Sequence, residues 1–203
     1  MTQSQEMHVI PLPRPDLAAA PLQRALEQRR STREFAHTPL PLAKASALLW
    51  AAQGPSATGR RTNPSAGATY PLELYLVAGA VEDLAPGLYR YRASEHALER
   101  VTARDLRADL VPAAAGQEFL REAPIAIAIA AVLERTSRKY GARARRYVDM
   151  EAGEVTQSVH LAAAAHGLGT VIVGAFDDAA VKRVLGLPPA EEPLALMPIG
   201  SPK

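Results

Sequence analysis

Helical spacing of apolar residues is the clearest pattern in the chain. After Pro41, which suits the first turn of a helix, apolar side chains recur three or four residues apart as far as Gln53. The same spacing from about Tyr147 to His166 predicts a helix that spans roughly 30 Å. Its alanines continue around the opposite face, which indicates burial on more than one side, in the core or at a subunit interface. Shorter helices are predicted over 22–30, Asp105–Ala115 and Asp177–Leu185, the last beginning at an aspartate that can cap it.

Short apolar or alternating runs predict a set of strands. "LELYLVA" (72–78) alternates like a strand, and "PIAIAIAAV" (124–132) is an apolar run typical of a buried strand. "GLYRYR" (87–92) and "ALERVT" (97–102) predict a hairpin. Further strands are predicted in "TVIVGAF" (170–176) and "PLALMPIG" (193–200).

Two stretches lack such patterns. Gly54–Pro71 is rich in Gly, Ser, Thr and Pro and is predicted to be a loop, and loops of that length usually bind something. Residues 1–20 contain several prolines and are predicted to form an extended arm. Residues 21–203 are then expected to form one domain of mixed helices and strands.

The composition excludes several classes of protein. Of the 203 residues, 48% are hydrophobic and 22% charged, as in ordinary globular domains, and a net charge of +2 does not favour nucleic acid or an anionic membrane as a partner. There is no cysteine, so disulfides, thiolate metal sites and a cysteine nucleophile are excluded. The longest apolar stretch, Ala123–Leu133, is too short to span a bilayer, and the first residues do not resemble a signal peptide. We therefore expect a cytoplasmic protein.

Common catalytic and metal-binding motifs are missing from the sequence. It contains no G-x-S-x-G elbow, phosphate-binding P-loop or G-x-G-x-x-G fingerprint, and the glycines near Gly167 are interpreted as the end of a helix. The basic run from Arg135 to Arg146 is interpreted as a solvated face or a set of ion pairs, because acidic residues lie close by. No metal site is expected, since the histidines lack metal-ligand spacing and are interpreted as structural or exposed: His8, His37, His96, His160 and His166.

The stretch "RRSTREF" (29–35) is the strongest candidate for chemistry. Its bland interpretation is a helix end whose arginines face water. Its functional interpretation is a phosphate site, in which Arg29, Arg30 and Arg33 surround the anion and Ser31 adds a hydrogen bond. A second stretch, "PSAG" (64–67), consists of small residues that let a backbone approach a flat ligand just before a strand.

Taken together and in this order, these stretches resemble the nitroreductase-like FMN-dependent oxidoreductases, most closely the SagB-type branch that includes thiazole and oxazole peptide dehydrogenases. The resemblance covers about residues 10–202. It implies an α+β nitroreductase-like fold, with a central mixed, mainly antiparallel sheet flanked by helices, in an intertwined homodimer. The motifs that carry it are "RRSTREF", "LLWAAQG", "PSAGATYPLELYLV", "GLYRY", "KYG", "EAG" and "GLGTVIVGAFDDAAVKRVLGLP".

The resemblance also implies a set of site residues. Arg29, Arg30 and Ser31 are expected to serve the FMN phosphate, and Arg33 is expected near the N1–C2 carbonyl edge of the flavin. The segment Pro64, Ser65, Ala66 and Gly67 is expected to contact the flavin from the partner subunit, so that the FMN sites lie at the homodimer interface. Gly174 and Ala175 are expected beside the ring, where a backbone N–H can reach N5 and a larger side chain would block hydride transfer.

Three functions follow from the resemblance. The first is an FMN-dependent oxidoreductase that passes hydride from NAD(P)H through flavin N5 to a small organic acceptor, of quinone or nitroaromatic type. The second is an azoline peptide dehydrogenase, in which Lys139 and Tyr140 of "KYG" are catalytic; a tyrosine anchoring a loop beside a surface lysine is the structural alternative. The third is a protein that binds or senses FMN without turnover. Glu154 departs from the histidine that many relatives have after "EAG".

Overall fold

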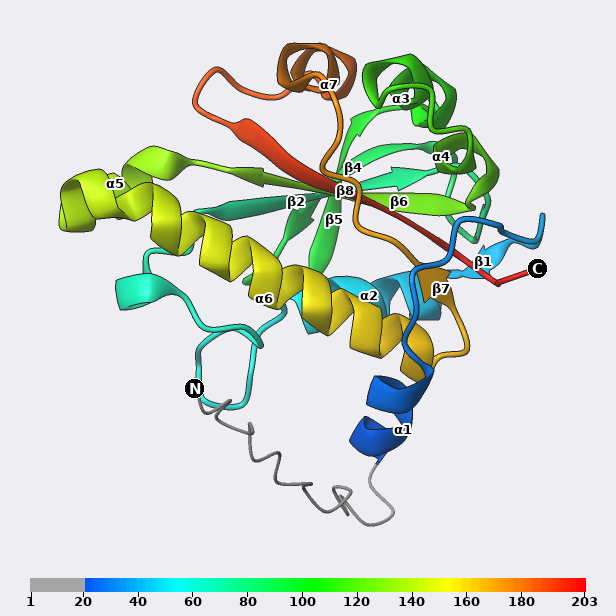
Figure 1. Cartoon of the computed structure of the whole chain (residues 1–203), viewed down its shortest axis with the longest axis horizontal. Coiled ribbons are helices and arrows are strands. Elements are labelled where there is room, and N and C mark those ends of the chain that lie inside the picture. The colour runs from blue at the N-terminus through cyan, green and yellow to red at the C-terminus, as the bar shows by residue number, and fades with distance from the viewer. Residues whose placement is uncertain (1–20) are drawn as a thin grey trace, which may run out of the picture.

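A central six-stranded sheet organises the structure, a computed structural model that describes residues 21–203 (Figure 1). The predicted arm at 1–20 lies outside the described residues. The strand order is β5-β4-β2-β6-β8-β7, and every neighbouring pair is antiparallel. The strands are β2 (Leu72–Ala78), β4 (Gly87–Arg92), β5 (Ala97–Thr102), β6 (Ile125–Ala131), β7 (Gly169–Thr170) and β8 (Glu192–Gly200). A separate parallel pair joins β1 (Leu40–Pro41) to β3 (Val81–Glu82).

Helices cover both faces of this sheet (Figure 1). The long α6 (Ala144–Ala165) and α2 (Leu42–Gln53) pack on one face, and α3 (Arg107–Ala113) and α7 (Asp178–Leu185) pack on the other. The short α4 (Phe119–Glu122) follows α3. At the two ends of α6 lie α5 (Leu133–Tyr140), directly before it in the chain, and α1 (Pro21–Gln28), beside its last turns. The α+β architecture with a mainly antiparallel sheet is confirmed.

The central strand β6 shows why the sheet accepts helices on both faces. Its isoleucines, Ile125, Ile127 and Ile129, belong to the core beneath α2 and α6, whereas the alternating alanines belong to the core beneath α3 and α7. All seven residues of β6 are buried. Each isoleucine removed from water contributes about 1.5–3 kcal/mol to folding. The predicted buried strand is therefore confirmed.

Most other predicted elements are also confirmed. The helix expected from Tyr147 begins three residues earlier, at Ala144, and ends at Ala165, with the positive φ of Gly167 just beyond it. The predicted hairpin is β4 and β5. The side chain of Asp177 accepts a hydrogen bond from the backbone N–H of Ala180 and caps α7 as expected. In the basic run, ion pairs join α5 and α6 residues to acids, among them Arg138–Glu134 and Arg145–Asp149.

The strand predicted over 170–176 is wrong for most of its length. Only Thr170 of that stretch belongs to β7, and beyond it a single bridge, Val173 to Leu196, holds the chain to β8. Val171 and Val173 are buried while Ile172 is exposed, so the side chains still alternate in burial as they do in a strand. The chain leaves the edge of the sheet because it has a neighbouring strand on one side only, and continuous pairing is not enforced there. Among residues 21–203, no helix is both long and apolar enough to cross a bilayer.

Candidate functional site

The arginine stretch lies where the chain leaves α1 and reaches the edge of the sheet. Ser31 forms a parallel bridge with Thr170, and the backbone N–H of Thr32 donates to the carbonyl of Thr170 at 2.9 Å. This pairing fixes the backbone between the last turns of α6 and β7. The stretch is therefore an anchored segment rather than a frayed helix end.

A cavity of about 490 Å³ opens beside this segment. Arg29 and Arg30 line it, together with Thr32 and with His160 of α6. Ser31 and Arg33 are exposed and are not among the lining residues. Within residues 21–203, the side chains of the three arginines make no ion pair. Glu27 also lines the cavity but is bonded by the Gln23 side chain, and an anion bound between the arginines relieves the repulsion between them.

Two buried polar atoms at this cavity lack a hydrogen-bond partner within residues 21–203: Oγ1 of Thr32 and Nδ1 of His160. Both atoms are buried, so a group bound in the cavity would meet the Nε2 side of the His160 ring and neither of these two atoms. Burial lowers the pKa of His160, and the nearby Arg29 lowers it further. Arginines and an imidazole around one cavity suit the phosphate end of a nucleotide cofactor.

A second group of expected residues belongs to the long loop between α2 and β2. Asn63 holds the loop to the end of α2 through its side-chain NH₂, which donates to the carbonyls of Ala51 and Ala52. Past it, Pro64 is exposed and the hydroxyl of Ser65 accepts a hydrogen bond from the backbone N–H of Tyr70 at 2.8 Å. The 3-10 turn Ala66–Ala68 and Tyr70 follow, and Gly67, Ala68 and Tyr70 all have positive φ. Such strained backbone concentrates at binding sites.

Lys139 and Tyr140, at the end of α5, lie directly against Gly67. The ammonium of Lys139 is 3.5 Å from the Gly67 carbonyl oxygen, and a Cβ at position 67 would lie 2.5 Å from the hydroxyl oxygen of Tyr140. The Tyr140 ring meets the Tyr147 ring edge-on, with centroids 5.0 Å apart. The structure thus brings the loop residues and the lysine–tyrosine pair together, which the sequence did not indicate.

Behind the loop, a buried polar network that the sequence did not reveal ties the loop to α2 and α6. Glu151 of α6 is 3% exposed and is bonded to the Ser65 hydroxyl and, at 3.5 Å, to the Gln53 amide. Gln53 accepts a 2.8 Å hydrogen bond from Arg61, whose guanidinium lies 4.4 Å from the centroid of the Tyr70 ring. Burial raises the pKa of Glu151 above its usual value.

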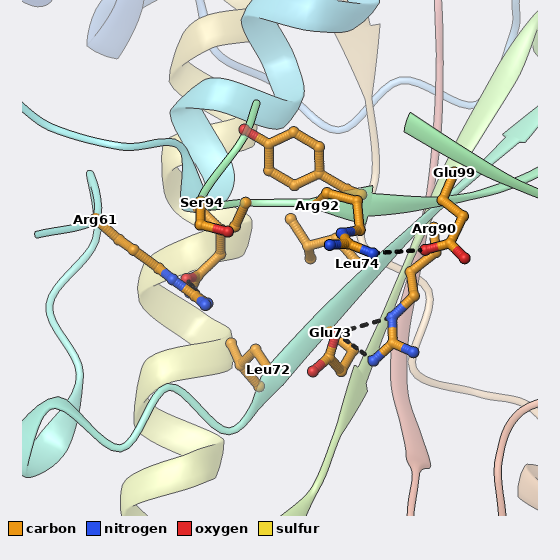
Figure 2. A pocket seen from close by; sticks show the side chains of 11 residues that line it. Arg61, Leu72, Glu73, Leu74, Arg90, Arg92, Ser94 and Glu99 are labelled. Atoms are coloured by element: carbon orange, nitrogen blue, oxygen red, sulfur yellow. Dashed lines mark hydrogen bonds and ion pairs between the residues drawn. The ribbon is translucent and has the colours of Figure 1, made fainter. Parts of the chain in front are cut away.

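Arg61 also reaches into a second polar cavity, of about 320 Å³ (Figure 2). Its other charged lining is already paired, because Arg90 bonds Glu73 and Arg92 bonds Glu99. Desolvation lowers the pKa of Arg61, and the charge of Glu73 is the largest influence that opposes this shift. We interpret this cavity as the solvated side of the network that supports the loop.

Gly174 and Ala175 lie in the extended segment after β7, and both are exposed. A Cβ built at Gly174 would meet no atom within 4 Å, so the chain itself leaves space there. The Ala175 carbonyl accepts a hydrogen bond at 3.1 Å from Gln117, which also donates to the Ala114 carbonyl and so fixes the segment. Within residues 21–203, no group of His, Asp or Glu side chains could hold a metal ion.

The two groups of expected residues lie along α6. The arginine cavity is lined by His160, whereas Gly67 lies beside the tyrosine that packs on Tyr147 in the first turn of the helix. Thirteen residues of helix rise, about 20 Å, separate Tyr147 from His160. The loop reaches between these points, because the side chain of Asn63 accepts a 2.6 Å hydrogen bond from the Ser158 hydroxyl. The turn at Gly67 is therefore remote from the arginine cavity, whereas the start of the loop lies close to it.

Comparison with known proteins gives a consistent picture. The model of the nitroreductase family matches residues 26–201. A protein of Methanocaldococcus jannaschii whose name assigns it provisionally to the nitroreductases is 44% identical over 187 residues, which are 92% of this chain and 93% of that protein.

Solved structures are also similar to this chain. One from Ralstonia eutropha JMP134, also named provisionally as a nitroreductase, is 33% identical with a TM-score of 0.80 and covers 95% of this chain and 88% of its own. A chain of the Escherichia coli microcin synthetase McbBCD complex shares the fold, with a TM-score of 0.82 at 24% identity, over 100% of this chain and 77% of that one.

Proposed function

Because the chain belongs to the nitroreductase family, a family of flavin-dependent oxidoreductases, we propose that it is an FMN-dependent enzyme that passes two electrons from NAD(P)H to a small organic acceptor. Quinones and nitroaromatic compounds are acceptors of the expected type. The observation that carries the proposal is the cavity lined by Arg29 and Arg30, whose guanidinium groups make no ion pair within residues 21–203. Such a cavity suits the FMN phosphate.

Each part of the site has its own task in this proposal. Arg29 and Arg30 bind the phosphate, with the Ser31 hydroxyl as a further donor. Arg33 lies near the N1–C2 edge of the ring, where a fixed cation stabilises the negative charge of the reduced form. FMN supplies the hydride chemistry at N5, so the protein needs no acid–base pair of its own for that step. Gly174 and Ala175 leave one face of the ring open, consistent with the empty space around Gly174.

The proposal includes a homodimer with FMN at its interface. The turn at Gly67 lies about 20 Å along α6 from His160 of the arginine cavity, so within one chain this turn stands away from the phosphate site. Two copies related by a twofold axis bring the cavity of one to the loop of the other. The partner's loop then presents Pro64, Ser65, Ala66 and Gly67, whose backbone can approach the flat ring closely.

A second candidate function is the oxidation of an azoline ring in a peptide. The observation that favours it is the contact of Lys139 and Tyr140 with Gly67, because the two polar side chains then stand at the loop proposed to cover the flavin. With FMN bound, the cofactor would supply the hydride acceptor for a ring C–H bond and would be reoxidised by oxygen. Lys139 or Tyr140 would remove the proton from the neighbouring ring atom. Lys139→Met with Tyr140→Phe should abolish that oxidation and leave FMN bound; unchanged turnover would remove the candidate.

The decisive test begins with the absorbance spectrum of the purified protein, followed by anaerobic mixing with NADH and with NADPH. Flavin absorbance that bleaches rapidly identifies an enzyme, whereas bound flavin that does not bleach identifies a carrier or sensor. A colourless protein that takes up no added FMN contradicts the proposal.

Complementation tests the shared site. A chain with Arg29→Ala and Arg30→Ala is mixed with a chain carrying Gly67→Val, and neither homodimer retains a complete site. Each mixed dimer has one intact site if the arginines and the loop come from different copies. FMN binding should therefore return on mixing, and its failure to return excludes this arrangement.

A further inference from the structure

His160 is a buried polar residue that the proposed function leaves unused. It lies on α6, is 7% exposed, and lines the same cavity as Arg29 and Arg30. Its Nδ1 is buried without a partner, and no ring nitrogen of His160 is bonded within residues 21–203. A histidine that only filled the core would satisfy at least one nitrogen, because each unpaired buried polar group costs about 1–3 kcal/mol.

The surroundings of the ring determine which nitrogen carries the proton. A proton on Nδ1 would be a buried donor without an acceptor, so the neutral tautomer with the proton on Nε2 is favoured. Because Nδ1 is buried, Nε2 is the ring nitrogen that can face the cavity. In this tautomer the ring therefore offers the cavity one hydrogen-bond donor and no charge. The pKa of His160 is lowered by burial and by Arg29, which keeps the ring in this neutral form.

The other groups around the cavity set its overall character. Arg29 and Arg30 supply two positive charges, and Glu27 supplies one negative charge. Glu27 is engaged by the Gln23 side chain, which donates to it at 2.9 Å. The hydroxyl of Thr32 is buried against Gly169 and does not reach the cavity. Two cations and one neutral N–H donor suit a phosphate ester.

We propose that His160 completes the oxyanion site of Arg29 and Arg30, its Nε2–H donating a hydrogen bond to the phosphate group of FMN. This inference rests on the proposed function, which assigns the phosphate to the arginines and Ser31. Riboflavin lacks the group that this N–H contacts, so the hydrogen bond discriminates the phosphorylated cofactor from riboflavin. His160 is thus a specificity-determining residue for the cofactor.

The first test compares the affinities of FMN and riboflavin by flavin fluorescence titration. His160→Leu keeps similar bulk and removes the donor, and it should weaken FMN binding about tenfold with little change for riboflavin, as expected for a lost hydrogen bond to an anion. His160→Gln returns an N–H close to the position of Nε2 and should restore much of the preference. His166→Leu is the matched control, because His166 is exposed and lies beyond the end of α6.

Equal FMN to riboflavin preference in the wild type and His160→Leu would overturn the inference while leaving FMN binding, and hence the proposed function, intact. A change in the NADPH to NADH preference instead would assign the histidine to the nicotinamide phosphate and would also overturn it.

The second test does not need flavin. Protein labelled with 15N-histidine reports the tautomer directly, with the His160 signal identified by its loss in His160→Gln. We expect the Nε2–H tautomer in the free protein and a shift of that Nε2 signal on addition of inorganic phosphate. An Nδ1–H tautomer, or a signal indifferent to both phosphate and FMN, overturns the inference. If the wild type binds neither flavin, the proposed function fails, and the phosphate titration still decides whether the oxyanion site exists.

Discussion

The ammonium of Lys139 lies 3.5 Å from the carbonyl oxygen of Gly67, although 72 residues separate them in the chain. The same glycine faces the Tyr140 hydroxyl so closely that a Cβ would be 2.5 Å from its oxygen. Gly67 has a φ of +58°, so both its backbone conformation and its surroundings favour glycine. The shape of the loop and the position of the lysine–tyrosine pair are therefore coupled.

Gly67→Ala should disturb the loop more than its backbone cost alone explains. A left-handed alanine costs about 1–2 kcal/mol, and here Lys139 and Tyr140 must also move. We expect FMN affinity to fall by about tenfold or more, measured by fluorescence titration. Gly186→Ala is the control, since Gly186 has a φ of +61° with no atom within 4 Å of its Cβ. That variant should lose stability but keep flavin affinity; equal flavin affinities in the two variants would contradict the coupling.

Gly174→Val should leave the fold unchanged and impair turnover. No atom lies within 4 Å of a Cβ at this position, so the free energy of unfolding should change by no more than about 0.5 kcal/mol. The added side chain would stand where the acceptor is proposed to approach the flavin, and the rate of acceptor reduction should fall at least about tenfold. Ala179→Val on the exposed part of α7 serves as control. Full turnover in Gly174→Val would place the flavin elsewhere.

The elements that were predicted correctly are those whose own residues specify them. β6 alternates isoleucine with alanine and is buried on both faces, and α6 carries valines at helical spacing. By contrast, α5 has no apolar stripe in "LERTSRKY", and it depends on the Arg138–Glu134 pair and on Arg135 bonding Glu73 of β2. The contact of Arg135 with Glu73 is long-range and cannot be found from local spacing.

Candidate site residues could be named from the sequence one by one, but their arrangement could not. The arginine stretch and the "PSAG" loop stand out by composition alone. The contact of Gly67 with Lys139, in contrast, depends on how the fold packs α5 against the loop. Nothing in the sequence distinguishes Glu151 from an exposed acid on a helix, because only the fold buries it beside Ser65. The role proposed for His160 could not be predicted from the sequence either, because it depends on the cavity that His160 shares with Arg29.

The buried carboxyl of Glu151 should make stability depend on pH in a defined direction. Burial raises its pKa in the folded state above the ordinary 4.5, so the native protein holds a proton that the unfolded chain has already lost. The resulting stabilisation is fully present below about pH 4.5 and is lost as pH rises through the folded-state pKa.

Urea unfolding of the wild type and Glu151→Gln across this range measures the effect as a difference. The stability of the wild type relative to the variant should fall as pH rises. Glu82→Gln, at an exposed acid of β3 that does not influence the pKa of Glu151, should run parallel to the wild type. A Glu151→Gln curve that also runs parallel would show that the carboxyl titrates as an ordinary exposed acid.

Gly153 tests whether α6 meets a second copy of the chain. It is exposed near the middle of the helix, with no atom within 4 Å of a Cβ, and Met150 one turn earlier is 50% exposed. In an isolated chain, Gly153→Ala should stabilise the helix by about 0.5–1 kcal/mol. If this face packs against a partner, the methyl group instead separates the two helices, and association and FMN binding should weaken together.

Sedimentation velocity over a range of concentrations distinguishes unchanged association from weakened association. Ala179→Gly on exposed α7 is the control, because it measures the effect of helix propensity on stability without altering association. A variant that is more stable and associates as the wild type does would exclude this face of α6 from the interface, and the shared FMN site would then require a different pairing of the two copies.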